Sequence, residues 1–157
     1  MKLVLTLILL FVSIDLVGQV RPRPKERKVN SLIEQGGGEI TSQTSEIRSV
    51  FRRIEKGLLD GAVADIADEF ADQVAVQMSG VEAGTYSSIQ AGALLQSFLS
   101  SRKPASFSFS RTSETSPIVF ATGRLYYVHR GSKESVQVYV SLAQQNGRWV
   151  IVQFNMY

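Results

Sequence analysis

From Ala105 to the end of the chain, apolar and polar residues alternate, and this period of two predicts strands. Turn-forming residues interrupt the alternation, and Asn146-Gly147 is the strongest signal for a tight hairpin. The predicted strands pass through Phe107 and Phe109, then run over 118–128 to a hairpin tip at 130–133, over 136–142, and over 148–156. Consecutive strands joined by short turns pair antiparallel, so this half of the chain predicts an antiparallel sheet.

The residues before this point repeat at helical spacing instead. Three helices are predicted, the first through Ile47, Val50, Phe51, Ile54 and Leu58, the second through Val63, Ile66, Ala67 and Phe70, and the third through Ile89, Ala93, Leu94 and Phe98. Ser87 or Ser88 is expected to cap the third helix, and a short strand over 74–78 precedes it. This order predicts an α+β fold, in which a strongly curved antiparallel sheet forms a cone around the first helix.

Residues 1–18 predict a cleavable signal peptide. Lys2 supplies the positive charge, and the apolar run that follows ends before Asp15. This run is shorter than the roughly 20 apolar residues of a membrane-spanning helix, so cleavage after Gly18 is preferred to a membrane anchor. Residues 19–44 predict a basic, Pro-rich and then Gly/Ser-rich flexible linker, which leaves residues 45–157 as one domain.

The composition excludes several classes of function. The chain has no cysteine, so disulfides, thiolate metal sites and a lipid-modified cysteine are ruled out, and the mature protein is expected to be periplasmic or secreted without a membrane anchor. The domain carries eleven basic and ten acidic side chains, a balance that argues against nucleic-acid binding. A single histidine rules out His-rich metal sites, and no phosphate-loop motif is present, so no cofactor is predicted.

The order of elements resembles the nuclear transport factor 2-like superfold, a cystatin-like (SnoaL-like) cone, over residues 45–157. A narrower resemblance, to a family of small secreted bacterial proteins of unknown function, rests on Gly84-Thr85-Tyr86-Ser87-Ser88-Ile89-Gln90-Ala91, Leu94, Phe98, Pro104, Phe107, Gly123-Arg124-Leu125 and Trp149-Val150-Ile151-Val152-Gln153. The resemblance implies the cone fold, and it implies no particular chemistry.

Three residues of one predicted strand are candidates for ligand binding. Catalytic members of the superfold use ionisable groups inside the cone, and His129, the only histidine, shares a strand face with Tyr127. A partly exposed structural histidine beside the hairpin tip is the preferred interpretation of His129. Arg124 could bind an anion if its face lines the cone, and it is a solvated charge if that face is convex. No catalytic residue and no metal ligand is predicted.

Two functions remain open. The preferred one is an exported cell-envelope module that binds a ligand or a partner without catalysis, because no convergent acid–base pair can be named. The alternative is a small-molecule enzyme, such as an isomerase, dehydratase or hydrolase, that acts in the cone pocket. Two facing ionisable side chains in a buried pocket would favour the enzyme, whereas a cone filled by Phe, Val and Leu would count against it.

Two partners are expected. The first is a small hydrophobic ligand in the cone. The second is another copy of the chain, bound through the convex face of the sheet, where Tyr139, Trp149 and Ile151 are predicted to be exposed. The alternation in the last strand then assigns the opposite face to Val150, Val152, Phe154 and Met156.

Overall fold

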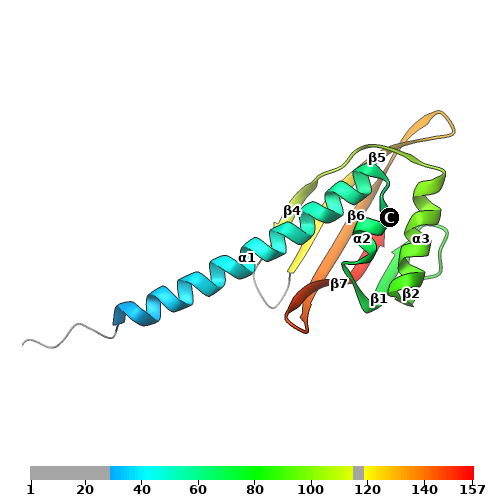
Figure 1. The fold of residues 1–157 in the computed structure, drawn as a ribbon. Helices are drawn as coiled ribbons and strands as arrows, with labels where there is room; N and C mark the ends of the chain where they lie inside the picture. The colour runs from blue at the N-terminus through cyan, green and yellow to red at the C-terminus, as the bar shows by residue number, and fades with distance from the viewer. Residues whose placement is uncertain (1–28, 115–118) are drawn as a thin grey trace, which may run out of the picture.

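The computed structural model describes the backbone of residues 29–114 and 119–157, and the side chains of residues 41–114 and 119–157. Its elements are α1 (Val29–Asp60), α2 (Val63–Ala67), β1 (Phe70–Met78), β2 (Gly84–Ser87), α3 (Ser88–Ser100), β3 (Lys103–Ser106), β4 (Phe109–Ser113), β5 (Val119–His129), β6 (Ser132–Gln145) and β7 (Arg148–Met156). The three helices lie on one face of a curved sheet (Figure 1). The predicted α+β class and cone-shaped sheet are confirmed.

The sheet has seven strands in the order β2-β1-β7-β6-β5-β3, and β4 continues beside β5 along the same edge as β3. The predicted meander β5-β6-β7 is antiparallel throughout. The pairing of β1 with β7 is parallel, which the sequence did not indicate. Strand β1 also begins at Phe70, where a continued helix was expected, and β2 was not predicted.

Helix α1 begins at Val29, so residues 29–44, which were predicted as flexible linker, are helical in the structure. The reason is cooperativity: the half of α1 that packs on the sheet provides the nucleus, and each added residue then needs no new nucleation. The N-terminal half of α1 extends beyond the sheet (Figure 1). The predicted signal peptide and residues 19–28 lie outside the described residues. No helix in the described part of the chain combines the length and hydropathy needed to cross a membrane.

The core forms where the predicted apolar stripe of α1 meets the concave face of the sheet. Ile47, Val50, Phe51, Ile54 and Leu58 are all buried, which confirms the helical period. Opposite them lie buried residues from alternate positions of β5 and β6: Val119, Ala121, Leu125, Val136, Val138, Val140 and Leu142. The concave face is thus filled by packed apolar side chains.

Two backbone signals in the sequence are also confirmed. Asn146 and Gly147 both have positive φ, of 51° and 77°, as the tight turn between β6 and β7 requires. Ser87 caps α3: its hydroxyl accepts a hydrogen bond from the Gln90 amide, and the Gln90 side chain accepts one from the Ser87 amide.

The predicted inner face of β7 is confirmed at Phe154 and Met156 and is wrong before them, because the strand contains a bulge. Ser141 of β6 pairs with Gln153, whereas its neighbour Leu142 pairs with Ile151, so Val152 has no partner on β6. The extra residue reverses the alternation. Trp149 and Ile151, expected on the convex face, are 8% and 0% exposed, and Ile151 lies in the same core as Phe154 and Met156.

The convex face therefore presents a different set of side chains from the predicted one. Tyr139 does lie there, because it alternates with buried Val138 and Val140. Its ring stacks on that of Phe120 from β5, with centroids 5.8 Å apart and 17° between the ring planes. Both aromatic rings are half-buried.

The edge formed by β3 and β4 passes very close to the middle of β5. The closest approach is at Gly123, where a Cβ atom would overlap the carbonyl oxygen of Ser108 and lie 3.1 Å from Cα of Phe109. Phe109 then turns inward and meets Phe51 of α1 edge-on, at 5.4 Å between centroids. Because Gly123 has only a hydrogen atom as its side chain, the edge formed by β3 and β4 can close over the core.

Candidate functional site

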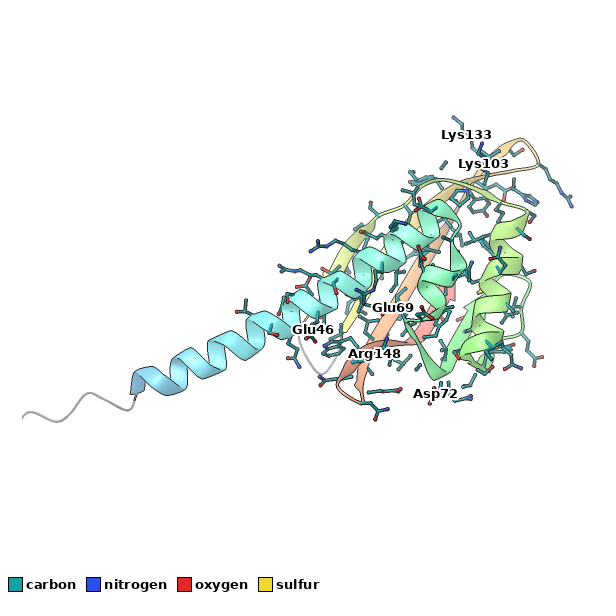
Figure 2. All side chains as sticks on the ribbon, viewed as in Figure 1. Glu46, Glu69, Asp72, Lys103, Lys133 and Arg148 are labelled. Atoms are coloured by element: carbon teal, nitrogen blue, oxygen red, sulfur yellow. The ribbon has the colours of Figure 1, made fainter. Side chains whose placement is uncertain are left out.

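An open pocket of about 150 Å³ lies between the C-terminal half of α3 and the end of β1, and we call it the Arg102 pocket. Figure 2 labels Lys103, the residue after Arg102, at this end of the molecule. The lining of the pocket consists of Met78, Ser79, Gly80, Val81, Leu94, Ser97, Phe98 and Arg102. An apolar cavity of similar size in another protein holds a benzene ring. The pocket thus has room for one small organic group.

Arg102 is held in place by the end of α3. Its Nη1 donates to the carbonyl oxygen of Phe98, at 2.9 Å, and so satisfies a helix C-terminal acceptor. The guanidinium carbon lies 4.0 Å from the centroid of the Phe98 ring and 5.7 Å from that of Tyr127. These contacts fix the orientation of the cation before any ligand arrives.

In the described part of the chain, no carboxylate compensates the charge of Arg102. None of the ion pairs among the described residues includes Arg102. Its Nε is buried and has no hydrogen-bond acceptor. A buried N–H without an acceptor is unfavourable, and more so when the group is charged. An anion that reached Nε would remove this penalty.

The other lining residues define what kind of anion fits. Leu94 and Phe98 provide an apolar wall, and Ser79 and Ser97 add hydroxyl groups. The described residues that line the pocket include no carboxylate and no imidazole, so none of them could accept a proton at neutral pH. This combination suits binding of a small carboxylate with an apolar body.

The structure separates the three candidate residues of β5. Tyr127 is 7% exposed and packs edge-on against Phe98, at 5.8 Å between ring centroids, so it supports the wall of the Arg102 pocket. His129 lies nearby, with Nδ1 2.9 Å from the carbonyl oxygen of Ser101. Arg124 is exposed on the opposite face of the strand, where Nη1 donates to Ser135 Oγ at 3.3 Å. Arg124 is therefore a solvated charge and is not part of this pocket.

Arg102 itself was not recognised from the sequence. The available signal was its spacing from Phe98. Residues four apart lie on one side of a helix, so an arginine four residues after a phenylalanine at a helix end is positioned over that ring. The unpaired state of the cation depends on which chain segments surround it, and the sequence does not show that.

No group of three or more His, Asp or Glu side chains in the described residues is arranged to hold a metal ion. Glu69 is the only buried charged side chain in the described part of the chain, and it belongs to a different cleft, beside α1 and the β6–β7 turn.

Comparison with known proteins identifies a family and a fold. Residues 51–156 match the family described as Domain of unknown function (DUF4783). Comparison with curated proteins finds no match. A DUF4783 family protein from Bacteroides uniformis has a similar structure, with TM-score 0.60 and 15% identity over 67% of this chain and 93% of that one.

Two further solved structures extend the likeness of fold. A protein of unknown function with a cystatin-like fold from Nostoc punctiforme gives TM-score 0.51 and 18% identity, over 71% of this chain and 86% of that one. An LEH-like epoxide hydrolase from M. tuberculosis gives TM-score 0.56 and 12% identity, over 72% of this chain and 82% of that one. The fold is thus the nuclear transport factor 2-like cone, which hosts both enzymes and proteins without known activity.

Proposed function

Since the chain belongs to the DUF4783 family of domains of unknown function, we propose its function from its own side chains: it is an exported, non-catalytic module that binds a small apolar carboxylate in the Arg102 pocket. The observation that carries the proposal is the guanidinium of Arg102, which has no carboxylate partner among the described residues and a buried Nε without an acceptor, beside an apolar wall. The apolar wall would take the body of the ligand, and the guanidinium its carboxylate.

The packing of the cone supports binding rather than catalysis. Ile54, Leu95, Leu125, Val138 and Phe154, which fill the concave side, are each at most 1% exposed. The one buried carboxylate in the described residues, that of Glu69, has both oxygens bound to Arg53. The filled interior also moves the expected ligand site from the cone to the pocket beside α3.

Export is part of the proposal and rests on the apolar segment after Lys2 and on the absence of cysteine. Mass spectrometry of the intact protein from a cell-envelope or culture-medium fraction of the native host tests it. We expect a mature N-terminus at Gln19. A cytosolic protein that retains Met1 to Gly18 would contradict export while leaving the Arg102 pocket untouched.

Benzoate is a suitable probe for the pocket, because it joins a carboxylate to a single ring. We expect saturable binding by calorimetry and at least tenfold weaker binding to Arg102→Gln, since hydrogen bonds to charged groups contribute about 1.5–3 kcal/mol and about 1.4 kcal/mol is tenfold. Benzyl alcohol has a similar shape but no charge. The unchanged protein should bind it about as weakly as Arg102→Gln binds benzoate.

Arg124→Gln is the matched control, because it removes the same charge from the exposed face of β5. Its affinity for benzoate should equal that of the unchanged protein. Thermal unfolding of both variants shows whether the loss of the contact with the Phe98 carbonyl has disturbed α3. Equal binding by Arg102→Gln and Arg124→Gln, or no saturable binding to any variant, contradicts the proposal.

Formation of a homodimer through the convex face stays a prediction, now centred on Phe120 and Tyr139 instead of Trp149 and Ile151. Sedimentation at micromolar concentration should show a dimer, and Tyr139→Glu, which places a charge in the aromatic pair, should give a monomer with unchanged circular dichroism. A monomeric unchanged protein rules the dimer out.

A further inference from the structure

A second polar cleft lies on another side of the domain, between the middle of α1 and the β6–β7 turn. Its volume is about 200 Å³, and its lining consists of Glu46, Ser49, Val50, Arg53, Glu69, Gly147, Arg148 and Trp149. Figure 2 labels Glu46, Glu69 and Arg148 close to one another, on α1, just before β1 and at the start of β7. We call it the Trp149 cleft.

One wall of the cleft is a fixed ion pair. Arg53 donates from Nε to Oε1 of Glu69 at 2.5 Å and from Nη2 to Oε2 at 3.2 Å. Its Nη1 donates to Ser49 Oγ at 3.2 Å. A guanidinium has five N–H groups, so two remain for a ligand, and each carboxylate oxygen of Glu69 keeps a further lone pair. Rigid donors and acceptors thus stand side by side.

Trp149 gives the second, independent indication of a ligand. Its side chain lines the cleft and is more than nine-tenths buried, yet its indole Nε1–H has no hydrogen-bond acceptor among the described residues. Buried N–H groups in folded proteins are nearly always paired. An oxygen atom of a bound molecule that reached Nε1 would supply the missing acceptor.

The charges of the lining cancel. Glu46 and Glu69 contribute two carboxylates, and Arg53 and Arg148 two guanidinium groups. Arg148 is partly engaged, since its Nη2 lies 3.4 Å from the carbonyl oxygen of Asp68. A lining without net charge does not favour an ion of either sign. It favours a neutral molecule whose groups can both donate and accept hydrogen bonds, and hydroxyl groups do both.

The geometry points to a neutral, hydroxyl-rich ligand of one ring, a single sugar residue, in the Trp149 cleft. The volume of about 200 Å³ is below the roughly 300 Å³ at which pockets for drug-sized ligands begin, so one ring is the size that fits. Val50 and the indole supply apolar surface for the C–H groups of the sugar. This site is separate from the Arg102 pocket in both position and ligand chemistry.

The chain carries its own reporter for this site, because Trp149 is its only tryptophan. Methyl α-glucoside, methyl α-mannoside, methyl β-galactoside and N-acetylglucosamine are titrated into the protein while the emission of Trp149 is followed. We expect a saturable change with at least one of them at millimolar concentration. Added sodium chloride should leave the affinity unchanged, because the ligand is neutral. Sodium acetate, titrated in parallel, should give no saturable change.

Glu46→Ala tests the lining with little risk to the fold, because Glu46 is exposed on α1. The loss of one acceptor should weaken sugar binding about fivefold. Glu134→Ala is the matched control, because it also removes an exposed glutamate carboxylate, near the start of β6. This position is at the opposite end of β6 from the cleft, so Glu134→Ala should bind the sugar as the unchanged protein does.

Trp149→Phe removes the indole N–H and is followed by calorimetry, with an expected loss of about tenfold. Arg102→Gln should bind sugar normally, which separates this inference from the proposed carboxylate site. The inference is overturned if no sugar gives a saturable change, if acetate does so instead, or if Glu46→Ala and Glu134→Ala bind the sugar equally well.

Discussion

Replacing Gly123 by alanine is expected to lower the free energy of unfolding by about 3 kcal/mol, at the upper end for overpacking of a well-packed site. The added Cβ would overlap the Ser108 carbonyl oxygen and lie 3.0 Å from a ring carbon of Phe107 and 3.1 Å from Cα of Phe109. Two of these three contacts are with backbone, which cannot rotate away as a side chain can. The β3–β4 edge must therefore move away from β5, and the contact of Phe109 with Phe51 loosens with it.

Gly84→Ala is the control for this prediction. Gly84 is also in a strand and has no positive φ, but an added Cβ would meet only the side chain of Tyr86, at an ordinary 3.5 Å. Its stability should change by about 0.5 kcal/mol or less. Urea unfolding followed by the emission of Trp149 measures both variants. If the two lose the same stability, the close approach of Ser108 to β5 is not a constraint on the fold.

The second large effect is expected for Arg53→Met, which should cost about 2–3 kcal/mol. Removing one partner of a buried ion pair leaves the other charge buried and uncompensated, at about 3–5 kcal/mol. Here Glu69 has a side-chain exposure of 6% but Arg53 one of 49%, so water offsets part of the loss. The carboxylate of Glu69 would remain beside Trp149 and Val50 with no cation bound to it.

The double variant Arg53→Met/Glu69→Gln identifies the cause. If the buried charge dominates, the double variant is more stable than Arg53→Met alone, because the amide carries no charge. Arg48→Met serves as the control, since Arg48 lies exposed on the same helix and pairs with Glu114, which follows β4. Glu114 raises the pKa of Arg48 through a hydrogen bond and charge attraction, yet an exposed pair contributes little. Equal losses for Arg53→Met and Arg48→Met would contradict this account.

Much of the fold could be predicted from the sequence, because most of it follows from local periodicity. The stripe from Ile47 to Leu58 predicts the buried face of α1, and alternation in β5 and β6 predicts their inner faces. Periodicity says nothing about which strands become neighbours. The parallel pairing of β1 with β7 joins segments about eighty residues apart, and it was not foreseen.

The sites were predicted less well than the fold, for a related reason. Tyr127 and His129 were predicted to share one strand face, but Arg102, the cation over the Tyr127 ring, comes from the end of α3. The Trp149 cleft combines residues from α1, from just before β1 and from the β6–β7 turn. Each of these residues is ordinary within its own segment, and only the fold brings their charges and the unpaired indole N–H together.

The extra residue in β7 has a consequence for comparing this chain with its relatives. Before Val152 the odd-numbered residues, such as Ile151, point to the core, and after Gln153 the even-numbered ones, such as Phe154, do so. An alignment that keeps one uninterrupted phase along this strand therefore matches inward residues with outward ones on one side of the bulge. Relatives that lack the bulge should align with a single-residue gap at Val152. The presence or absence of that gap would be an inherited structural feature by which the family could be divided into branches.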